Sequence, residues 1–320
     1  MPAQPSTADR YARSVIGHQV PTERQRLRML EQMLDRGTRR IIEQRGIQPS
    51  WRCLELGAGS GSIARWLAAR CPDGQVIATD SDTSFLSALA APNLRVLRHD
   101  VVSEGFPPGS FDLIHARWLL VNLPEREAVL TKIVTWLAPG GWLVTEDPDA
   151  FAADSSPYPP LRRFSDAVER LIADSHGADL RWARRRLPRV LAELGLVELG
   201  MSVSMKTVGD GSASDLAYRM TLTQSRDEMI RRGLLTEAEY IAGIALLDEP
   251  SVIDLFANVA AWGRRPAKSS PTRDRRGTRR SRRPSTIKRS GGSGVRVPLR
   301  LRSASAPNQA RAAPGTASGS

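Results

Sequence analysis

The chain has 320 residues, enough for one large domain or two modest ones. Its 46 Lys and Arg exceed its 34 Asp and Glu by 12. Residues 264–320 hold 16 of these basic residues and a single acid, which leaves 30 basic and 33 acidic residues in the preceding part. The main body therefore lacks the basic excess that a groove tracking nucleic-acid phosphates needs.

Membrane, secretory and metal-binding classes are also disfavoured. The sequence has no apolar run of about 18 residues, and residues 1–13 lack the regions of a signal peptide. We therefore expect a cytoplasmic protein. Cys53 and Cys71 are the two cysteines, and two thiols cannot form a four-thiolate zinc site or, in a reducing compartment, a stable disulfide. We predict no metal site.

The first half alternates helical and strand patterns. Residues 22–45 place Leu and Ile at helical spacing, with Thr22 and Gln25 as a predicted capping box. Strands are predicted over residues 52–56, 76–79, 94–97, 111–115 and 142–145, and helices over 62–70, 84–90 and 124–137. Nearly continuous apolar strands separated by helices indicate a parallel sheet that is covered on both faces.

After Asp147 the pattern changes. Helices are predicted over residues 161–175, 180–194 and 212–247, and strands over 197–208 and 252–262, although the last segment also suits a helix. The predicted fold class is α/β, with a doubly wound, mostly parallel seven-stranded sheet and helical additions. From Ala267 onward few apolar residues are available to bury, so residues 267–320 are predicted to be a disordered basic tail.

A glycine-rich turn lies between the first strand and the next helix. Residues 54–61 read LELGAGSG, with glycines at positions 57, 59 and 61. Such a turn lets backbone approach a ligand closely and directs the amides of the helix N-terminus toward it. The spacing is GxGxG and not the GxGxxG of a dinucleotide site. A tight connection without any ligand is the alternative.

Acidic residues follow the strands around this turn. Asp80 ends the second strand, 23 residues after Gly57, where a carboxylate can accept hydrogen bonds from both ribose hydroxyls. Asp100 ends the third strand. The carboxyl ends of the strands meet at one crevice, so Glu55, Asp80 and Asp100 should line a single site. Three acids suit a nucleoside with a cationic side group, such as S-adenosylmethionine, better than a polyphosphate.

With these motifs the chain resembles a known family. Residues 54–61, 78–80 (ATD), 99–101 (HDV), 111–117 (FDLIHAR) and 137–142 (LAPGGW) are similar to the motifs of class I S-adenosylmethionine-dependent methyltransferases. Within that family, with its Rossmann-like fold, the small-molecule enzymes related to ubiquinone and menaquinone biosynthesis are the most similar. The resemblance covers about residues 48–147.

The resemblance implies roles for individual residues. Gly57, Gly59 and Gly61 would pack against the methionine moiety, and Glu55 would help to hold its amino group. Asp80 would bind the ribose, and Asp100 with the Val101 backbone would recognise the adenine. His115, Arg117 and Trp118 would lie near the transferred methyl group, with Arg117 counted among the cofactor-binding residues.

His115 is the candidate general base, because imidazole titrates near neutrality. The alternative is a side chain that only packs or hydrogen-bonds near the end of the strand. A base is needed only if the acceptor must lose a proton. Residues 115–118 (HARW) stand where enzymes that methylate exocyclic amines carry an Asn/Asp-Pro-Pro-Tyr/Phe motif, and no Pro-Cys nucleophile for cytosine C5 chemistry is present.

The resemblance also divides the chain. Residues 1–46 are predicted to be a helical lid, and residues 47–266 the methyltransferase domain, with helical insertions at about 148–195 and 212–247. Phe151, Tyr158, Phe164 and Trp182 are candidates for an apolar acceptor pocket or, equally, for the core. Tyr11 is expected to fold over the cofactor.

The predicted function is methyl transfer from S-adenosylmethionine to a small aromatic or polyketide-like metabolite, with oxygen as the first choice of acceptor atom, followed by nitrogen or carbon. One alternative is an RNA methyltransferase that gathers its substrate with the basic tail. A second alternative is a cofactor-binding scaffold without transfer activity. We expect a small-molecule partner and no membrane or nucleic-acid partner, and the sequence leaves the oligomeric state open.

Overall fold

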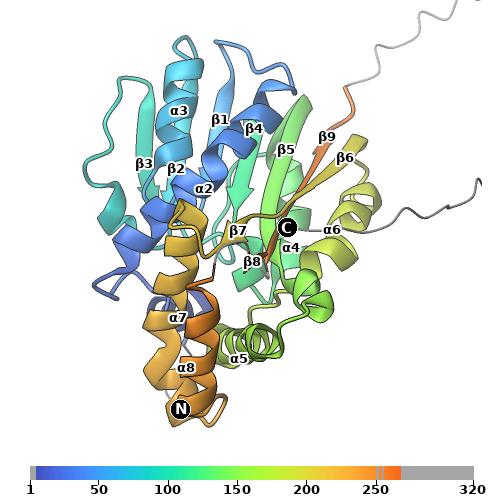
Figure 1. Cartoon of the computed structure of the whole chain (residues 1–320). Coiled ribbons are helices and arrows are strands. Elements are labelled where there is room, and N and C mark those ends of the chain that lie inside the picture. The colour runs from blue at the N-terminus through green and yellow to red at the C-terminus, as the bar shows by residue number, and fades with distance from the viewer. Residues whose placement is uncertain (1–4, 250–251, 254–255, 268–320) are drawn as a thin grey trace, which may run out of the picture. The chain divides into compact units, whose positions relative to one another are not determined.

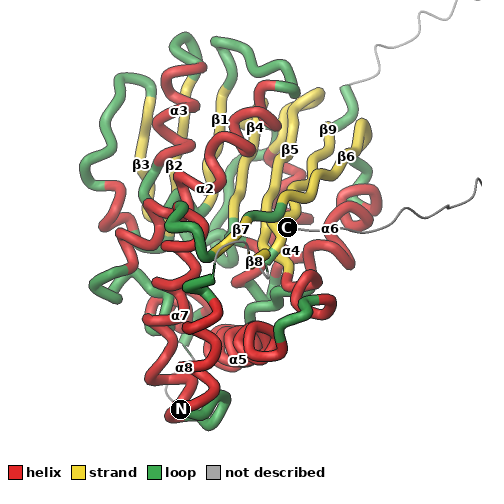
Figure 2. Tube along the Cα trace, in the orientation of Figure 1, coloured by secondary structure: helices red, strands yellow, loops and turns green. Residues whose placement is uncertain are grey.

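The computed structural model describes residues 5–249, 252–253 and 256–267. A seven-stranded sheet lies at its centre, in the order β3-β2-β1-β4-β5-β9-β6 (Figures 1 and 2). Its strands are β1 (Arg52–Leu56), β2 (Gln75–Asp80), β3 (Leu94–Arg98), β4 (Phe111–Arg117), β5 (Leu137–Asp149), β6 (Val197–Ser204) and β9 (Ala257–Arg264). Only β9 runs antiparallel to its neighbours, so the predicted mostly parallel α/β sheet is confirmed.

Helices cover both faces of this sheet (Figure 1). Leu113 of β4 and Val144 of β5 pack in one core with α2 (Glu23–Glu43) and α3 (Ser62–Arg70). Ile114 and Leu143, which adjoin Leu113 and Val144 in these strands, pack in the opposite core with α4 (Arg126–Trp136), α5 (Pro159–His176) and α6 (Trp182–Glu193). Successive side chains of a strand point to opposite faces, and helices cover both faces of this sheet. The central strands are therefore apolar on both faces.

The remaining elements surround the carboxyl ends of the parallel strands. They are α1 (Thr7–Ala12), α7 (Ala213–Arg231), α8 (Glu237–Leu246), the short 3-10 helices η1 (Thr83–Leu86), η2 (Leu120–Asn122) and η3 (Ala150–Ser155), and the pair β7 (Thr207–Val208) and β8 (Val252–Ile253). In Figure 1, α5, α7 and α8 gather beyond this end of the sheet, and α7 packs against α2.

Four local predictions are corrected. The predicted helix over residues 84–90 is limited to η1, because Asp82 caps the turn and the chain leaves it after Leu86. Thr22 makes no side-chain cap to α2. The predicted strand over 197–208 divides between two sheets as β6 and β7. The predicted helix over 212–247 is α7 followed by α8, because the chain turns at Gly233 (φ 66°) and Thr236 caps a new helix.

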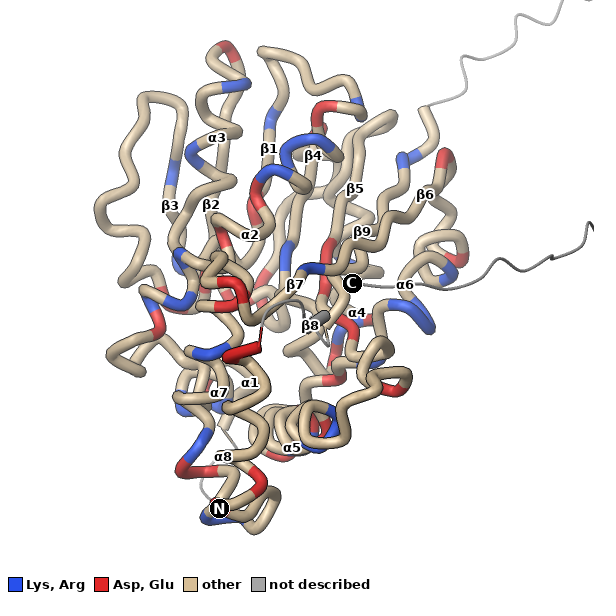
Figure 3. The backbone as a smooth tube through the Cα atoms, in the orientation of Figure 1, with Lys and Arg blue, Asp and Glu red and all other residues tan. Residues whose placement is uncertain are grey.

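The charge distribution agrees with the mildly acidic balance of residues 1–263. Figure 3 shows basic and acidic residues interspersed along the described part of the chain. Many are paired with each other, for example Arg186 with Glu127. The predicted disorder of residues 267–320 concerns a segment that, apart from Ala267, lies outside the described residues. The predicted limits of the lid and the insertions remain predictions.

Candidate functional site

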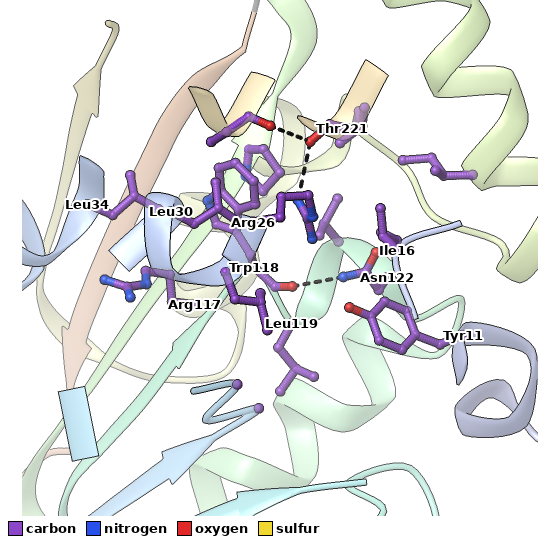
Figure 4. Close-up of a pocket in the computed structure, with 18 of the residues that line it drawn as sticks. Tyr11, Ile16, Arg26, Leu30, Leu34, Arg117, Trp118, Leu119, Asn122 and Thr221 are labelled. Atoms are coloured by element: carbon purple, nitrogen blue, oxygen red, sulfur yellow. Dashed lines mark hydrogen bonds between the residues drawn. The ribbon is translucent and has the colours of Figure 1, made fainter. Parts of the chain in front are cut away.

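A cavity of about 210 Å³ opens at the carboxyl ends of the parallel strands (Figure 4). One side, here called the cofactor wall, is formed by Gly57, Gly59, Asp80, Asp100 and Val101. The other side, here called the acceptor wall, contains Tyr11, Trp118, Tyr218 and Phe256. Side chains from α1, α2, α5 and α7 complete the lining, so segments from both ends of the described chain enclose the space.

The glycine turn shapes the cofactor wall. Gly57 has φ 64° and Gly59 has φ 55°, values that favour glycine. A Cβ on Gly57 would lie 3.2 Å from Leu119 Cδ1. Both residues line the cavity, whereas Gly61 does not: its absent Cβ makes room for Leu86 and Leu89. Gly57 and Gly59 therefore suit the predicted close approach of backbone to a ligand. Gly61 instead allows Leu86 and Leu89 to pack against the turn.

Asp80 is fixed at the centre of this wall. Its Oδ2 accepts a hydrogen bond of 3.0 Å from the Gly59 amide, and its Oδ1 accepts one of 3.1 Å from the Asp82 amide. Burial raises the pKa of Asp80, and these amides oppose that effect. The glycine turn and the carboxylate are thus held to each other, with the carboxylate at the cavity where a diol can reach it.

Asp100 and Val101 line the cavity beside Asp80. The Asp100 carboxylate accepts hydrogen bonds from the Val102 amide at 2.9 Å and from Ser103 Oγ at 2.8 Å. These bonds order the turn after β3, and a carboxylate has lone pairs beyond the two that they use. The structure brings Asp80, Asp100 and Val101 together as the sequence predicts.

Arg117 also lines the cavity, but α2 holds it. Its guanidinium donates to Asp35 Oδ1 and to Thr38 Oγ1, each at 3.0 Å. Glu31 of α2 accepts a hydrogen bond of 3.2 Å from the Ser62 amide, the first amide of α3. A carboxylate of the chain itself therefore occupies the N-terminus of α3, where a dinucleotide site would place a pyrophosphate. This arrangement disfavours NAD and FAD.

Glu55 and His115 are absent from the cavity lining, and this corrects the expectation that they face the ligand. His115 is fully buried; its Nδ1 lies 2.7 Å from Glu55 Oε2 and its Nε2 lies 3.3 Å from Glu146 Oε1. Burial of the ring opposes protonation, but the two carboxylates outweigh it and raise the pKa of His115 to about 9. Since both ring nitrogens are engaged away from the cavity, the geometry gives no support to His115 as a general base.

The predicted aromatic lining is also corrected. Phe151, Tyr158, Phe164 and Trp182 do not line the cavity. Phe164 and Trp182 are buried in the core, and Tyr158 is exposed. Tyr11 and Trp118, two aromatic residues expected at the site, do line the cavity, and the Tyr11 ring meets His176 edge-on at 5.4 Å.

Tyr218 and Phe256, whose rings lie 5.8 Å apart, could not be found from sequence patterns. Both belong to segments without a motif: the packing of α7 on α2 brings Tyr218 to the cavity, and Phe256 directly precedes β9. None of the helices in the described part of the chain combines the length and apolar composition needed to cross a bilayer.

Comparison with known proteins supports the cofactor wall. Residues 54–145 match the family described as Methyltransferase domain. Methyltransferase str3 of Strobilurus tenacellus is 42% identical over 100 residues, which cover 31% of this chain and 35% of that protein. Trans-aconitate 2-methyltransferase of Mycobacterium tuberculosis (strain ATCC 25177 / H37Ra) is 28% identical over 115 residues, or 36% of this chain and 44% of the relative. The chain thus spans less than half the length of these relatives.

Among solved structures, the plantazolicin methyltransferase BpumL in complex with a desmethyl analogue and S-adenosylhomocysteine has a TM-score of 0.46 and 12% identity, covering 80% of this chain and 95% of its own. At this level the likeness carries no argument about function. The family match itself confirms the predicted resemblance and the predicted cofactor, S-adenosylmethionine, for residues 54–145.

Proposed function

We propose that the chain transfers a methyl group from S-adenosylmethionine to a hydroxyl oxygen of a small, uncharged aromatic metabolite. The match of residues 54–145 to the Methyltransferase domain family supports the reaction type. The observation that carries the proposal is the single cavity that the cofactor wall shares with an aromatic acceptor wall. Both reactants can therefore be held in one enclosed space.

The cofactor fits the residues of the cofactor wall. Asp80 would accept hydrogen bonds from the ribose hydroxyls, and Asp100 with the Val101 amide would recognise the adenine. Gly57 and Gly59 leave room for the methionine moiety, and Arg117 would meet its carboxylate. When bound, the cofactor supplies an electrophilic methyl group. The protein would contribute alignment of the acceptor and exclusion of water.

The acceptor wall supports an aromatic substrate. Tyr11, Trp118, Tyr218 and Phe256 reach the cavity from four different segments. Aromatic rings stack or meet edge-on with gains beyond simple burial. Because α1, α2 and α7 enclose the cavity, its acceptor should be small.

The basic residues of the lining support an uncharged acceptor. Three Lys and Arg side chains line the cavity, namely Arg26, Arg117 and the exposed Lys206. Arg26 donates to both carboxylate oxygens of buried Glu23, at 2.8 and 2.7 Å, and Arg117 is bound to Asp35. Arg26 is thus paired with Glu23, and Arg117 is shared between Asp35 and the cofactor carboxylate. This leaves the exposed Lys206 alone among the described lining Lys and Arg to meet an acceptor, which disfavours a tricarboxylate as substrate.

The test is a transfer assay with the full chain and isotopically labelled S-adenosylmethionine. Parallel reactions receive a panel of planar phenols, their methyl ethers, trans-aconitate and a mixed RNA sample, and methylated products are identified by mass. The proposal expects label in phenols and none in the methyl ethers. Transfer to trans-aconitate or RNA, with the phenols unchanged, would overturn the acceptor class. The cytoplasmic location remains a prediction.

A further inference from the structure

Trp118, the first residue after β4, has an unusual backbone conformation. Its φ is 55°, a left-handed value that a bulky side chain rarely adopts. Such conformations persist only where the surrounding structure holds them, and they cluster at functional sites. Here the backbone is held on both sides. The Trp118 amide donates to the Glu146 carbonyl at 2.7 Å, and its carbonyl accepts from Asn122 Nδ2 at 2.8 Å (Figure 4).

The indole of Trp118 is held as well. Its Nε1 donates to Asn258 Oδ1 at 2.9 Å, and both residues line the cavity. Asn258 Nδ2 donates in turn to Glu146 Oε2 at 2.7 Å. An amide carries its donor and its acceptor on opposite sides, so the bond to Glu146 fixes which atom of Asn258 faces the indole.

The chain of hydrogen bonds continues across the sheet. The other oxygen of Glu146 faces His115 Nε2, and His115 Nδ1 faces Glu55 Oε2. Both neighbours are carboxylates, so they favour the imidazolium form of the ring, in which both nitrogens donate. Glu55, His115 and Glu146 are all at most 3% exposed. Four strands, β1, β4, β5 and β9, thus contribute one side chain each to a buried row that ends at Trp118.

We propose that Trp118 is a specificity-determining residue on whose indole a planar aromatic acceptor stacks, and that Asn258, Glu146, His115 and Glu55 are positioning residues that fix this indole at the cavity. The proposal rests on the proposed function for its acceptor class. It explains why three buried charged residues, Glu55, His115 and Glu146, are connected to the cavity-lining Asn258 without lining the cavity themselves, and gives His115 a role that its closed environment permits.

The positioning part is tested without any acceptor. The full chain has seven tryptophans; it is labelled with 5-fluorotryptophan, and the Trp118 resonance is identified by its loss in Trp118→Phe. We expect this resonance to shift or broaden in Asn258→Ala and, three hydrogen bonds away from the indole, in His115→Gln. If His115→Gln does not fold, Glu146→Gln replaces it. Thr145→Val is the control, because Thr145 is buried on the same strand as Glu146 and its hydroxyl makes no hydrogen bond within the described part of the chain. A Trp118 resonance that moves in Asn258→Ala but is unchanged in the folded His115→Gln or Glu146→Gln variant would overturn the role of the row.

The stacking part uses a fluorescent phenol, 7-hydroxy-4-methylcoumarin, titrated into the full chain saturated with S-adenosylhomocysteine. We expect Trp118→Leu to weaken phenol binding about tenfold and Trp118→Phe to weaken it less, while both keep the affinity for S-adenosylhomocysteine within about twofold of wild type. Equal binding by Trp118→Leu and wild type would overturn the stacking role. If the wild type binds S-adenosylhomocysteine but no phenol, the aromatic acceptor class and the stacking role both fail, while the fluorine measurement still decides the positioning role.

Discussion

The cofactor wall and the acceptor wall of the cavity are built from very different stretches of sequence. Residues of the cofactor wall lie between positions 57 and 101, each at or just after the end of a strand. The aromatic residues of the acceptor wall lie at positions 11, 118, 218 and 256, in four segments that are far apart in the sequence. A neighbouring strand positions each member of the first set, whereas the docking of α1 and α7 positions much of the second.

This difference explains why one wall has a recognisable motif and the other does not. A carboxylate at the end of a parallel strand points into the crevice whatever the rest of the chain does. An aromatic residue on α7 faces the cavity only because α7 packs on α2. We therefore expect substitutions in the two walls to separate cofactor affinity from acceptor affinity.

Gly59→Arg should have the largest effect. A left-handed backbone and a long side chain inside the cavity should weaken S-adenosylhomocysteine binding by about 100-fold or more. Gly109→Arg is the matched control, because Gly109 has φ 74° but a Cβ there would meet no described atom within 4 Å. It should lower stability by a similar backbone effect without changing affinity. Calorimetric titration measures both variants, and equal affinities would contradict the placement of the glycine turn.

His115→Gln should change how the free energy of unfolding depends on pH, because it removes the charged ring between Glu55 and Glu146. The folded pKa of about 9 lies above the ordinary value of 6.5. Protonation of His115 therefore stabilises the fold by up to about 3 kcal/mol below pH 6.5, and this contribution is lost as the pH rises through about 9. The free energy of unfolding in urea should fall more for wild type than for the variant between pH 6 and pH 9.5. The variant is needed because Asp147, whose pKa burial raises to about 8, also lowers stability as the pH rises. Parallel pH curves would refute the imidazolium.

Asp80→Ala should act on the cofactor alone. Loss of hydrogen bonds to a charged group costs about 1.5–3 kcal/mol, so the affinity for S-adenosylhomocysteine should fall about 10- to 100-fold. Asp82→Ala is the control, since its carboxylate caps η1 and does not line the cavity. Asp82→Ala should bind within about twofold of wild type. Equal losses in both variants would mean that the loop, and not the Asp80 carboxylate, determines binding.

Tyr218→Leu should show the opposite pattern at the acceptor wall. Loss of an aromatic contact should weaken 7-hydroxy-4-methylcoumarin binding by up to about tenfold, with the affinity for S-adenosylhomocysteine nearly unchanged. Tyr158→Leu is the control, because Tyr158 is exposed and lies outside the cavity lining. Fluorescence titration of the cofactor-product complex measures both. A large loss of cofactor affinity in Tyr218→Leu would show that the two walls do not act separately.

The predicted ranges of β1 and α3 match the structure. Both elements were predictable because the local sequence pattern determines them. Gly57, Asp80 and Asp100 were predictable for the same reason. Tyr218 and Phe256 were not predictable. No motif in the sequence distinguishes Tyr218 from the exposed Tyr158, and only tertiary packing buries Tyr218 at the cavity. The prediction that His115 faces the ligand was wrong. Its position near the end of β4 suggests access to the cavity, but Glu55 and Glu146 enclose its ring.

The most direct measurement is calorimetric titration of the full chain with S-adenosylhomocysteine. A parallel titration with NAD serves as the comparison. A site built from Gly57, Gly59, Asp80 and Asp100, with Glu31 on the first amide of α3, should bind S-adenosylhomocysteine at micromolar concentrations and leave NAD unbound. A folded protein that does not bind S-adenosylhomocysteine, or that prefers NAD, would contradict the assignment of this cavity to methyl transfer.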